Sequence, residues 1–136
     1  MTAEFFVDSG AWFPLAYPSD PDHEEFARGL RALLAEGRRP VTTNLVIAET
    51  HALLLARRRR RAALAFLREV RRPPIVVVTS DEALEERAKN DWLERYDDQG
   101  FSYTDAVSFA VMTERGIRDA LAMDRHFATA GFTLLP

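Results

Sequence analysis

Short runs of β-forming residues alternate along this chain with longer stretches whose apolar residues recur at helical spacing. The runs that predict strands lie at residues 5–7, 41–42, 75–78, 120–123 and 132–135. The run 75–78 is the clearest and is apolar on both faces, whereas Pro14 and Pro18 limit regular structure after the first run. Such alternation is typical of right-handed βαβ units. The sequence therefore predicts a three-layer α/β/α fold with a central parallel sheet.

The length and composition of the chain fit one folded unit. With 136 residues and no internal repeat or linker-like segment, residues 1–136 are expected to form a single domain. Its 47% hydrophobic and 29% charged residues are typical of a soluble globular protein. No stretch resembles a signal peptide or reaches the ~18 apolar residues of a membrane helix. We therefore expect a cytoplasmic protein without a membrane partner.

The absence of cysteine narrows the chemistry that the chain can perform. Disulfides, zinc–thiolate sites and cysteine nucleophiles are all excluded. The three histidines lie far apart in the sequence, which argues against a histidine-rich metal site. A net charge of −3 argues against a protein that coats nucleic acid over its whole surface, but it does not bear on a local site.

Asp8 stands out because it directly follows the first apolar run, 5–7, and precedes the turn signal Ser9-Gly10. A short apolar run of this kind is typical of a central parallel strand that is buried on both faces. A carboxylate at the end of such a strand is unfavourable unless it is paired, hydrogen-bonded or bound to a metal. The rest of the chain must therefore supply a partner for Asp8.

Three further acids are placed so that they can reach Asp8. Asp124 follows a predicted strand at once, and Asp105 lies in the first turn of a predicted helix. Glu49 lies within the apolar stripe of the helix after the second strand. That stripe consists of Leu45, Ala48, Ala52, Leu53 and Ala56. Because ligands of open parallel sheets bind at the carboxyl ends of the strands, all four acids can converge on one cleft.

Four gathered carboxylates would repel one another and strain the fold without a counter-charge. No Lys or Arg is placed to neutralise all of them, whereas a divalent cation would do so. Oxygen ligands favour Mg²⁺ or Mn²⁺, and Mg²⁺ held by carboxylates takes its other ligands from waters and phosphate oxygens. The pattern thus indicates hydrolysis of a phosphodiester by a water whose pKa the metal lowers.

Four short segments carry the four acids in order along the chain. They are Phe6-Val7-Asp8-Ser9, Val41-Thr42-Thr43-Asn44 with Glu49, Ser102-Tyr103-Thr104-Asp105-Ala106, and Ala122-Met123-Asp124-Arg125-His126-Phe127. Together they resemble the motifs of the PIN-domain ribonucleases, most of all the small prokaryotic VapC-type toxins, and the similarity extends over nearly the whole chain. The resemblance implies a PIN-like sheet of about five strands and a metal-dependent endoribonuclease that cleaves RNA. It also implies a homodimer and inhibition by a small antitoxin protein.

The acids of the family pattern match, in order, Asp8, Glu49, Asp105 and Asp124. The resemblance implies that these four are the catalytic residues and the ligands of Mg²⁺ or Mn²⁺. The hydroxyl beside the first acid matches Ser9, and the one at the end of the second strand matches Thr43; both are expected to orient carboxylates or waters. Gly10 departs from the pattern, since many members carry Ser or Thr there.

Each acid also has an interpretation without chemistry. Asp105 and Asp124 can both cap helices, and Asp8 can cap a turn. Glu49 lies in mid-helix, so its alternative is an ion pair with a distant Arg. His126 is placed to act as a general base, although a structural or partly exposed side chain is the simpler interpretation.

The sequence fits two other enzyme classes less well than a nuclease. A haloacid-dehalogenase-type phosphatase needs a second Asp where this chain has Gly10, and a receiver-type phosphoacceptor needs a late Lys, whereas Lys89 is the chain's one lysine. An RNA-processing nuclease without a toxin role, or an inactive RNA- or protein-binding module, remains an alternative.

The run Arg57 to Arg61 could hold phosphates or form a solvated corner. Trp12, Phe13, Trp92 and Phe101 could stack bases or pack in the core.

Overall fold

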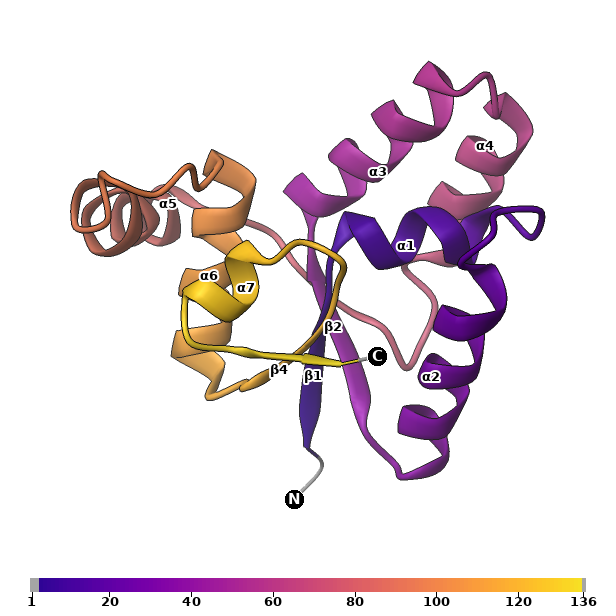
Figure 1. Cartoon of the computed structure of the whole chain (residues 1–136), viewed down its shortest axis with the longest axis horizontal. Coiled ribbons are helices and arrows are strands. Elements are labelled where there is room, and N and C mark those ends of the chain that lie inside the picture. The colour runs from indigo at the N-terminus through magenta and orange to yellow at the C-terminus, as the bar shows by residue number, and fades with distance from the viewer. Residues whose placement is uncertain (1–2, 136) are drawn as a thin grey trace.

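The computed structural model describes residues 3–135, and in these residues five strands form one parallel sheet (Figure 1). The strands are β1 (Glu4–Val7), β2 (Arg39–Thr43), β3 (Val76–Val78), β4 (Asp119–Leu121) and β5 (Thr133–Leu135). They lie in the order β3-β2-β1-β4-β5, and each neighbouring pair is parallel. The predicted α/β fold with a central parallel sheet is therefore confirmed.

β1 lies at the centre of the sheet, as its sequence predicts. Phe6 pairs with Val41 of β2 on one side and with Ala120 of β4 on the other. Phe5, Phe6 and Val7 are completely buried, since helices cover both faces of the strand. The carboxyl end of β1 is thus held rigidly at the edge of the core.

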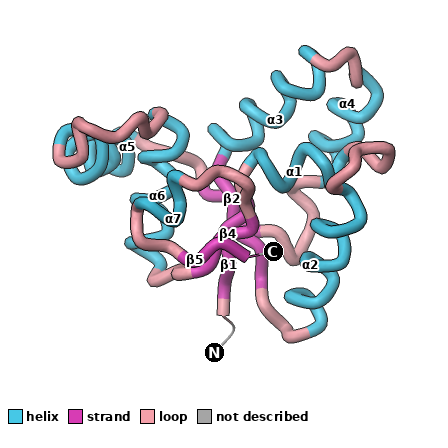
Figure 2. Tube along the Cα trace, in the orientation of Figure 1, coloured by secondary structure: helices cyan, strands magenta, loops and turns pink. Residues whose placement is uncertain are grey.

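Helices cover the sheet on both faces (Figure 1, Figure 2). One layer contains α1 (Ser9–Ala16), α2 (His23–Ala35), α3 (Asn44–Ala56) and α4 (Arg60–Glu69). The other contains α5 (Glu82–Ala88), the π-helical turn η1 (Lys89–Glu94), α6 (Tyr103–Arg115) and α7 (His126–Thr129). No helix within residues 3–135 is both long and apolar enough to cross a membrane.

Two local predictions are wrong. Helix α1 continues through Pro14, because burial of Ala11 and Trp12 in the core outweighs the loss of one backbone N–H. The run 75–78 does form a strand, β3, which lies at an edge of the sheet and is half-buried; β-branched residues suit edge and central strands alike. Strand β4 ends at Leu121, so a short loop separates it from Asp124.

The predicted apolar stripe of α3 is also wrong. The face that packs into the core carries Val46, Ile47, Thr50 and Leu54, whereas Leu53 on the predicted stripe is 42% exposed. Helix α3 is apolar nearly all round, so hydrophobic spacing alone does not identify its buried face. Glu49 therefore lies on the open side of the helix and not within the core, which changes how it reaches the other acids.

Candidate metal centre

A cleft of about 500 Å³ lies at the carboxyl edge of the sheet, beyond the ends of β1 and β4. It is lined by Asp8, Ser9, Gly10, Glu49, Gly100, Ser102, Asp105, Met123, Asp124 and His126. All four acids that the sequence singled out are among these residues, although they come from four separate segments. The lining contains no Lys or Arg. The cleft is thus an acidic site without a permanent counter-charge.

Asp8 forms the buried end of the cleft. Its backbone N–H donates to the carbonyl of Leu121 at 3.1 Å, which continues the β1–β4 pairing by one residue and fixes the start of the side chain. The carboxylate is 4% exposed, and its Oδ1 atom has no hydrogen-bond partner within the described residues. A buried carboxylate oxygen without a donor is unfavourable, so this atom is well suited to serve as a cation ligand.

Burial raises the pKa of the Asp8 carboxyl to about 7, and the backbone N–H of Ser9 opposes this shift. The charges of Glu49, Asp105 and Asp124 add to the rise in pKa. The pKa of Asp8 therefore depends on the charges of all three of the other acids. A cation bound between them would reverse the effect, because it favours the ionised form of each carboxyl.

Ser9 connects Asp8 to the open face of α3. It is the first residue of α1, and its hydroxyl donates a hydrogen bond to Oε1 of Glu49. This bond holds the half-buried Glu49 carboxylate at the cleft. The acid that the sequence placed in an apolar stripe is therefore positioned by a hydroxyl from another helix.

Asp105 serves the fold and the cleft at once. Its Oδ2 accepts a hydrogen bond from the backbone N–H of Ser102 at 3.2 Å, and its own N–H donates to the Ser102 hydroxyl at 3.0 Å. This capping box begins α6. The same Oδ2 lies 3.2 Å from Nδ1 of His126. The capping interpretation and the site interpretation of Asp105 are thus compatible.

Asp124 also combines two roles in the loop before α7. Its Oδ1 accepts a hydrogen bond from the backbone N–H of His126 at 2.8 Å, which holds the turn. Its side chain is 39% exposed, much more open than that of Asp105. Asp124 is therefore placed at the mouth of the cleft, whereas Asp8 is placed at its base.

His126 is partly exposed, as the sequence favoured, and it also lines the cleft. Its side chain is 35% exposed and its Nδ1 lies 3.2 Å from Asp105 and 3.4 Å from Asp124. The ring packs edge-on against Phe101, which fixes its orientation. The only signal in the sequence was its position two residues after Asp124.

Thr43 does not line the cleft. It is fully buried, and its hydroxyl accepts a hydrogen bond from the backbone N–H of Val46 at 3.1 Å. This makes Thr43 the N-cap of α3. The structure therefore places Ser9, but not Thr43, against the acids.

The donor atoms of the cleft fit a hard divalent cation. Asp105, Asp124 and His126 each offer a ligand atom, and these atoms lie within 4.8 Å of one another. Because Nδ1 of His126 can donate to Asp105, the histidine can orient that carboxylate and leave an all-oxygen ligand set. Together with the unpartnered oxygen of Asp8, this arrangement is consistent with a metal centre.

Comparison with known proteins identifies the protein family of this chain. Residues 5–132 match the model of the PIN domain family, and the chain therefore belongs to that family. The 23S rRNA-specific endonuclease VapC20 of Mycobacterium tuberculosis is 40% identical over 129 residues, which cover 93% of this chain and 94% of that one. The chain is thus a homologue of a VapC-type rRNA endonuclease toxin, which confirms the predicted resemblance.

Solved structures agree with this assignment. The crystal structure of M. tuberculosis VapC20, described as a Sarcin-Ricin loop cleaving toxin, matches with a TM-score of 0.83 and 36% identity, and covers 95% of this chain and 96% of that one. VapBC2 from Rickettsia felis, bound to a DNA fragment from its promoter, matches with a TM-score of 0.71 over 97% of both chains. Because the two sequences are only 10% identical, this match is evidence for a shared fold alone.

Proposed function

We propose that this chain is a metal-dependent endoribonuclease and the toxin of a toxin–antitoxin pair, with residues 1–136 acting as one nuclease domain. The observation that carries the proposal is the buried, unpartnered Oδ1 of Asp8 in a cleft with three more acids and no basic side chain. Such a site is unfavourable until a cation occupies it. The homology to an rRNA endonuclease supports RNA as the substrate.

Asp8, Glu49 and Asp105 would hold Mg²⁺ or Mn²⁺, and Asp124 would assist directly or through a water. These ions favour oxygen ligands, which all four side chains provide. When bound, the ion would supply a Lewis acid that lowers the pKa of a water and offsets charge on the phosphate. Because no Lys or Arg lines the cleft, the metal ion would have to offset the charge on the phosphate.

The residues of the chain itself orient the reacting groups. The end of β1 fixes Asp8, the hydroxyl of Ser9 holds Glu49 at the cleft, and Nδ1 of His126 holds Asp105. The open position of Asp124 leaves one side of the cleft accessible to a phosphodiester. Orientation of carboxylates by such neighbours typically changes metal affinity or activity about 10- to 100-fold.

The proposed substrate is ribosomal RNA in the cytoplasm, and the sarcin–ricin loop of 23S rRNA is the first sequence to test. The homologue that is 40% identical is named for 23S rRNA, and its crystal structure is described as that of a toxin that cleaves this loop. A small antitoxin and a second copy of the chain are the proposed partners, since both belong to the VapC type of toxin that the chain resembles.

Incubation of the purified protein with total RNA tests this function. We expect discrete cleavage with Mg²⁺ or Mn²⁺, no cleavage with EDTA, and mapped ends concentrated in 23S rRNA. Asp8→Asn is the inactive control, because it keeps the size of the side chain and removes the charge that a cation needs. Cleavage that persists in EDTA, or full activity of Asp8→Asn, would contradict the proposed mechanism.

The same experiment separates the alternatives. Discrete cleavage of a precursor RNA with no effect on mature rRNA would indicate a processing nuclease. Binding of RNA without cleavage by the wild-type protein, together with no binding of Mn²⁺ in calorimetry, would indicate an inactive binding module.

A further inference from the structure

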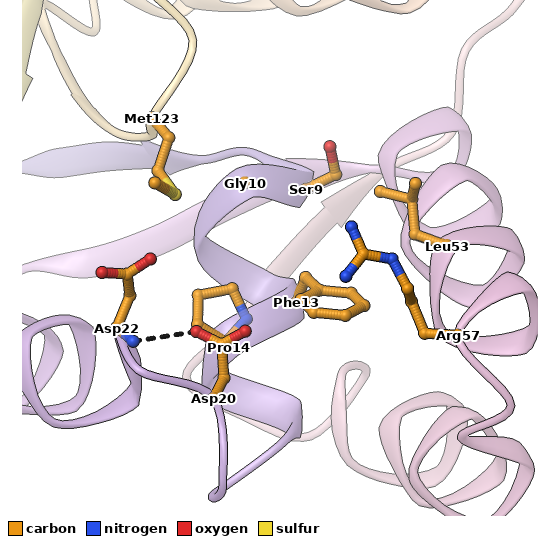
Figure 3. Close-up of a pocket in the computed structure, with 9 residues that line it drawn as sticks. All are labelled: Ser9, Gly10, Phe13, Pro14, Asp20, Asp22, Leu53, Arg57 and Met123. Carbon is orange, nitrogen blue, oxygen red and sulfur yellow. Dashed lines mark hydrogen bonds between the residues drawn. The ribbon is translucent and has the colours of Figure 1, made fainter.

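A second cavity of about 210 Å³ lies beside the metal centre (Figure 3). Ser9, Gly10 and Met123 line both this cavity and the acidic cleft, so the two spaces share a wall. The cavity is smaller than the roughly 300–1,000 Å³ of sites for drug-sized ligands. Its size and position suit one planar group of a molecule whose other part lies in the cleft.

The surfaces of the cavity are apolar where a flat ring would lie. Phe13 and Pro14 of α1 form one part of the lining, and Leu53 and Met123 add further apolar surface. Pro14 is held in place because its carbonyl accepts a hydrogen bond from Nδ1 of His23 at 2.7 Å. Aromatic and apolar side chains of this kind stack on the faces of nucleobases in single-stranded RNA.

Polar groups of opposite charge lie at two sides of the cavity. In Figure 3, Phe13 lies between Arg57 on one side and Asp20 and Asp22 on the other. The Arg57 guanidinium lies 5.7 Å from the centroid of the Phe13 ring. Within residues 3–135, none of these three charged side chains forms an ion pair. A ligand could therefore use both the cation and the carboxylates.

The fold fixes the positions of Asp20 and Asp22 without using all of their carboxylate oxygens as hydrogen-bond acceptors. Oδ1 of Asp20 accepts a hydrogen bond from the backbone N–H of Asp22 at 2.8 Å, which fixes the loop before α2. Asp22 precedes α2 directly, but its side chain makes no capping hydrogen bond. The carboxylate of Asp22 thus remains available as an acceptor for two donors.

Guanine is the base whose edges match these groups. Its N1–H and 2-amino group are adjacent donors that fit the two oxygens of one carboxylate, and its O6 and N7 are acceptors that fit Arg bidentately. Adenine and cytosine offer a single amino group beside ring acceptors, and uracil offers a single N–H. No other standard RNA base presents a pair of donors to Asp22 and a pair of acceptors to Arg57.

We propose that this cavity binds the guanine base of a nucleotide that flanks the cleaved phosphodiester. The proposal rests on the proposed ribonuclease function and adds a rule for substrate choice. Asp22 accepts from the Watson–Crick edge of the base, Arg57 donates to O6 and N7, and Phe13 contacts the face. The shared wall at Ser9 places this base next to the phosphate in the acidic cleft.

Cleavage of a randomised single-stranded RNA pool, followed by sequencing of the new ends, tests the rule. We expect guanine to dominate at one nucleotide beside the cut. Asp22→Asn should lower the preference for guanine about tenfold, because an amide replaces the acceptor pair. Asp98→Asn removes the same charge from an exposed loop and should leave the preference intact. Equal use of all four bases, or a preference unchanged in Asp22→Asn, would overturn the proposal.

Binding to the Asp8→Asn variant gives a readout that does not require cleavage. The probes are labelled oligouridine RNAs that contain one guanosine or one inosine, which lacks the 2-amino group. We expect about tenfold tighter binding of the guanosine probe. That difference should fall when Asp22→Asn is added, because Asp22 accepts from the 2-amino group. Arg57→Gln should weaken both probes by a similar factor, because inosine keeps O6 and N7. Arg61→Gln should change neither affinity, although Arg61 belongs to the same exposed basic run.

The two experiments distinguish failure of the guanine site from failure of the nuclease. If the wild-type protein does not cleave RNA, the proposed function fails, and the binding measurement alone decides the cavity. Tighter binding of guanosine that depends on Asp22 would then still support the base site. Equal affinity for the guanosine and inosine probes would overturn it.

Discussion

Asp8 is the residue at which folding and function conflict. Burial and three neighbouring acids raise the pKa of its carboxyl from 3.8 to about 7. The folded protein therefore holds a proton that the unfolded chain loses near pH 3.8. The stabilising effect of this proton is complete below that pH and is lost as the pH rises through about 7. At higher pH the metal-free protein carries an unfavourable buried charge.

We predict that Asp8→Asn stabilises the metal-free protein at about pH 8, by at most roughly 4 kcal/mol. The advantage should shrink as the pH falls from about 7 toward 3.8, since Asp8 is neutral in both states only below the lower value. Urea unfolding in EDTA at several pH values measures this difference. A variant that is less stable than the wild-type protein throughout this range would show that the buried charge is not a source of strain.

Ser9 has a smaller role that can be measured on metal binding. Removal of its hydroxyl in Ser9→Ala breaks the hydrogen bond to Glu49 and frees that side chain to turn into solvent. We expect the affinity for Mn²⁺, measured by calorimetry, to fall about tenfold while the fold is retained. Unchanged affinity would mean that Glu49 either needs no orientation or does not bind the ion.

At the scale of elements, α1 and the loop after β4 meet at Gly10. A Cβ atom added at Gly10 would lie 3.2 Å from both the backbone N and the Cβ of Met123. The loop that carries Asp124 would therefore have to shift by a few tenths of an ångström. The departure of Gly10 from the Ser or Thr of other family members thus fits the close approach of this loop.

We predict that Gly10→Ala lowers both the thermal stability and the cleavage rate, since it displaces Asp124 from the cleft. Gly100→Ala is the control for thermal stability alone, because a Cβ atom there would have no neighbour within 4 Å but Gly100 also lines the cleft. Thermal unfolding and cleavage rates of the two variants test this. Equal thermal stability of the two variants, together with a wild-type cleavage rate for Gly10→Ala, would show that the loop accommodates the Cβ atom without displacing Asp124.

Helix α3 begins directly after Thr43, whose hydroxyl caps the helix. Thr43→Val removes the acceptor for the N–H of Val46 and should lower the free energy of unfolding by about 1 kcal/mol. Thr43→Ser should restore it. We expect the cleavage rate per folded molecule to stay close to that of the wild-type protein in both variants. A large loss of rate in the fully folded Thr43→Val variant would instead support the role of Thr43 in orienting the acids.

The elements also show why some predictions failed. The alternation of strands and helices sufficed to predict the parallel sheet, since each run was short, apolar and bounded. The buried face of α3 could not be predicted, because apolar residues surround the helix and only packing against α1 and α4 selects a side. The partial exposure of His126 was expected, but its contact with Asp105 was not. That contact depends on the turn that Asp124 closes and on packing against Phe101, neither of which leaves a periodic signal.

At the scale of the whole molecule, the topology of the sheet brings the four acids together. Asp8 and Asp124 follow neighbouring parallel strands, while α3 and α6 begin at the same edge and carry Glu49 and Asp105. The convergence could be predicted because the carboxyl ends of parallel strands share one edge. The guanine site could not, since Arg57 meets Phe13 only through the packing of α3 on α1.

A divalent cation held by these acids is proposed to make the protein a ribonuclease. The most direct test titrates the single-turnover rate of cleavage of a sarcin–ricin loop RNA with Mn²⁺ and compares the midpoint with the Kd from calorimetry in the same buffer. We predict that the two values agree and that Asp8→Asn loses both metal binding and cleavage. A cleavage rate that does not depend on Mn²⁺, or that survives in a variant unable to bind it, would contradict the account.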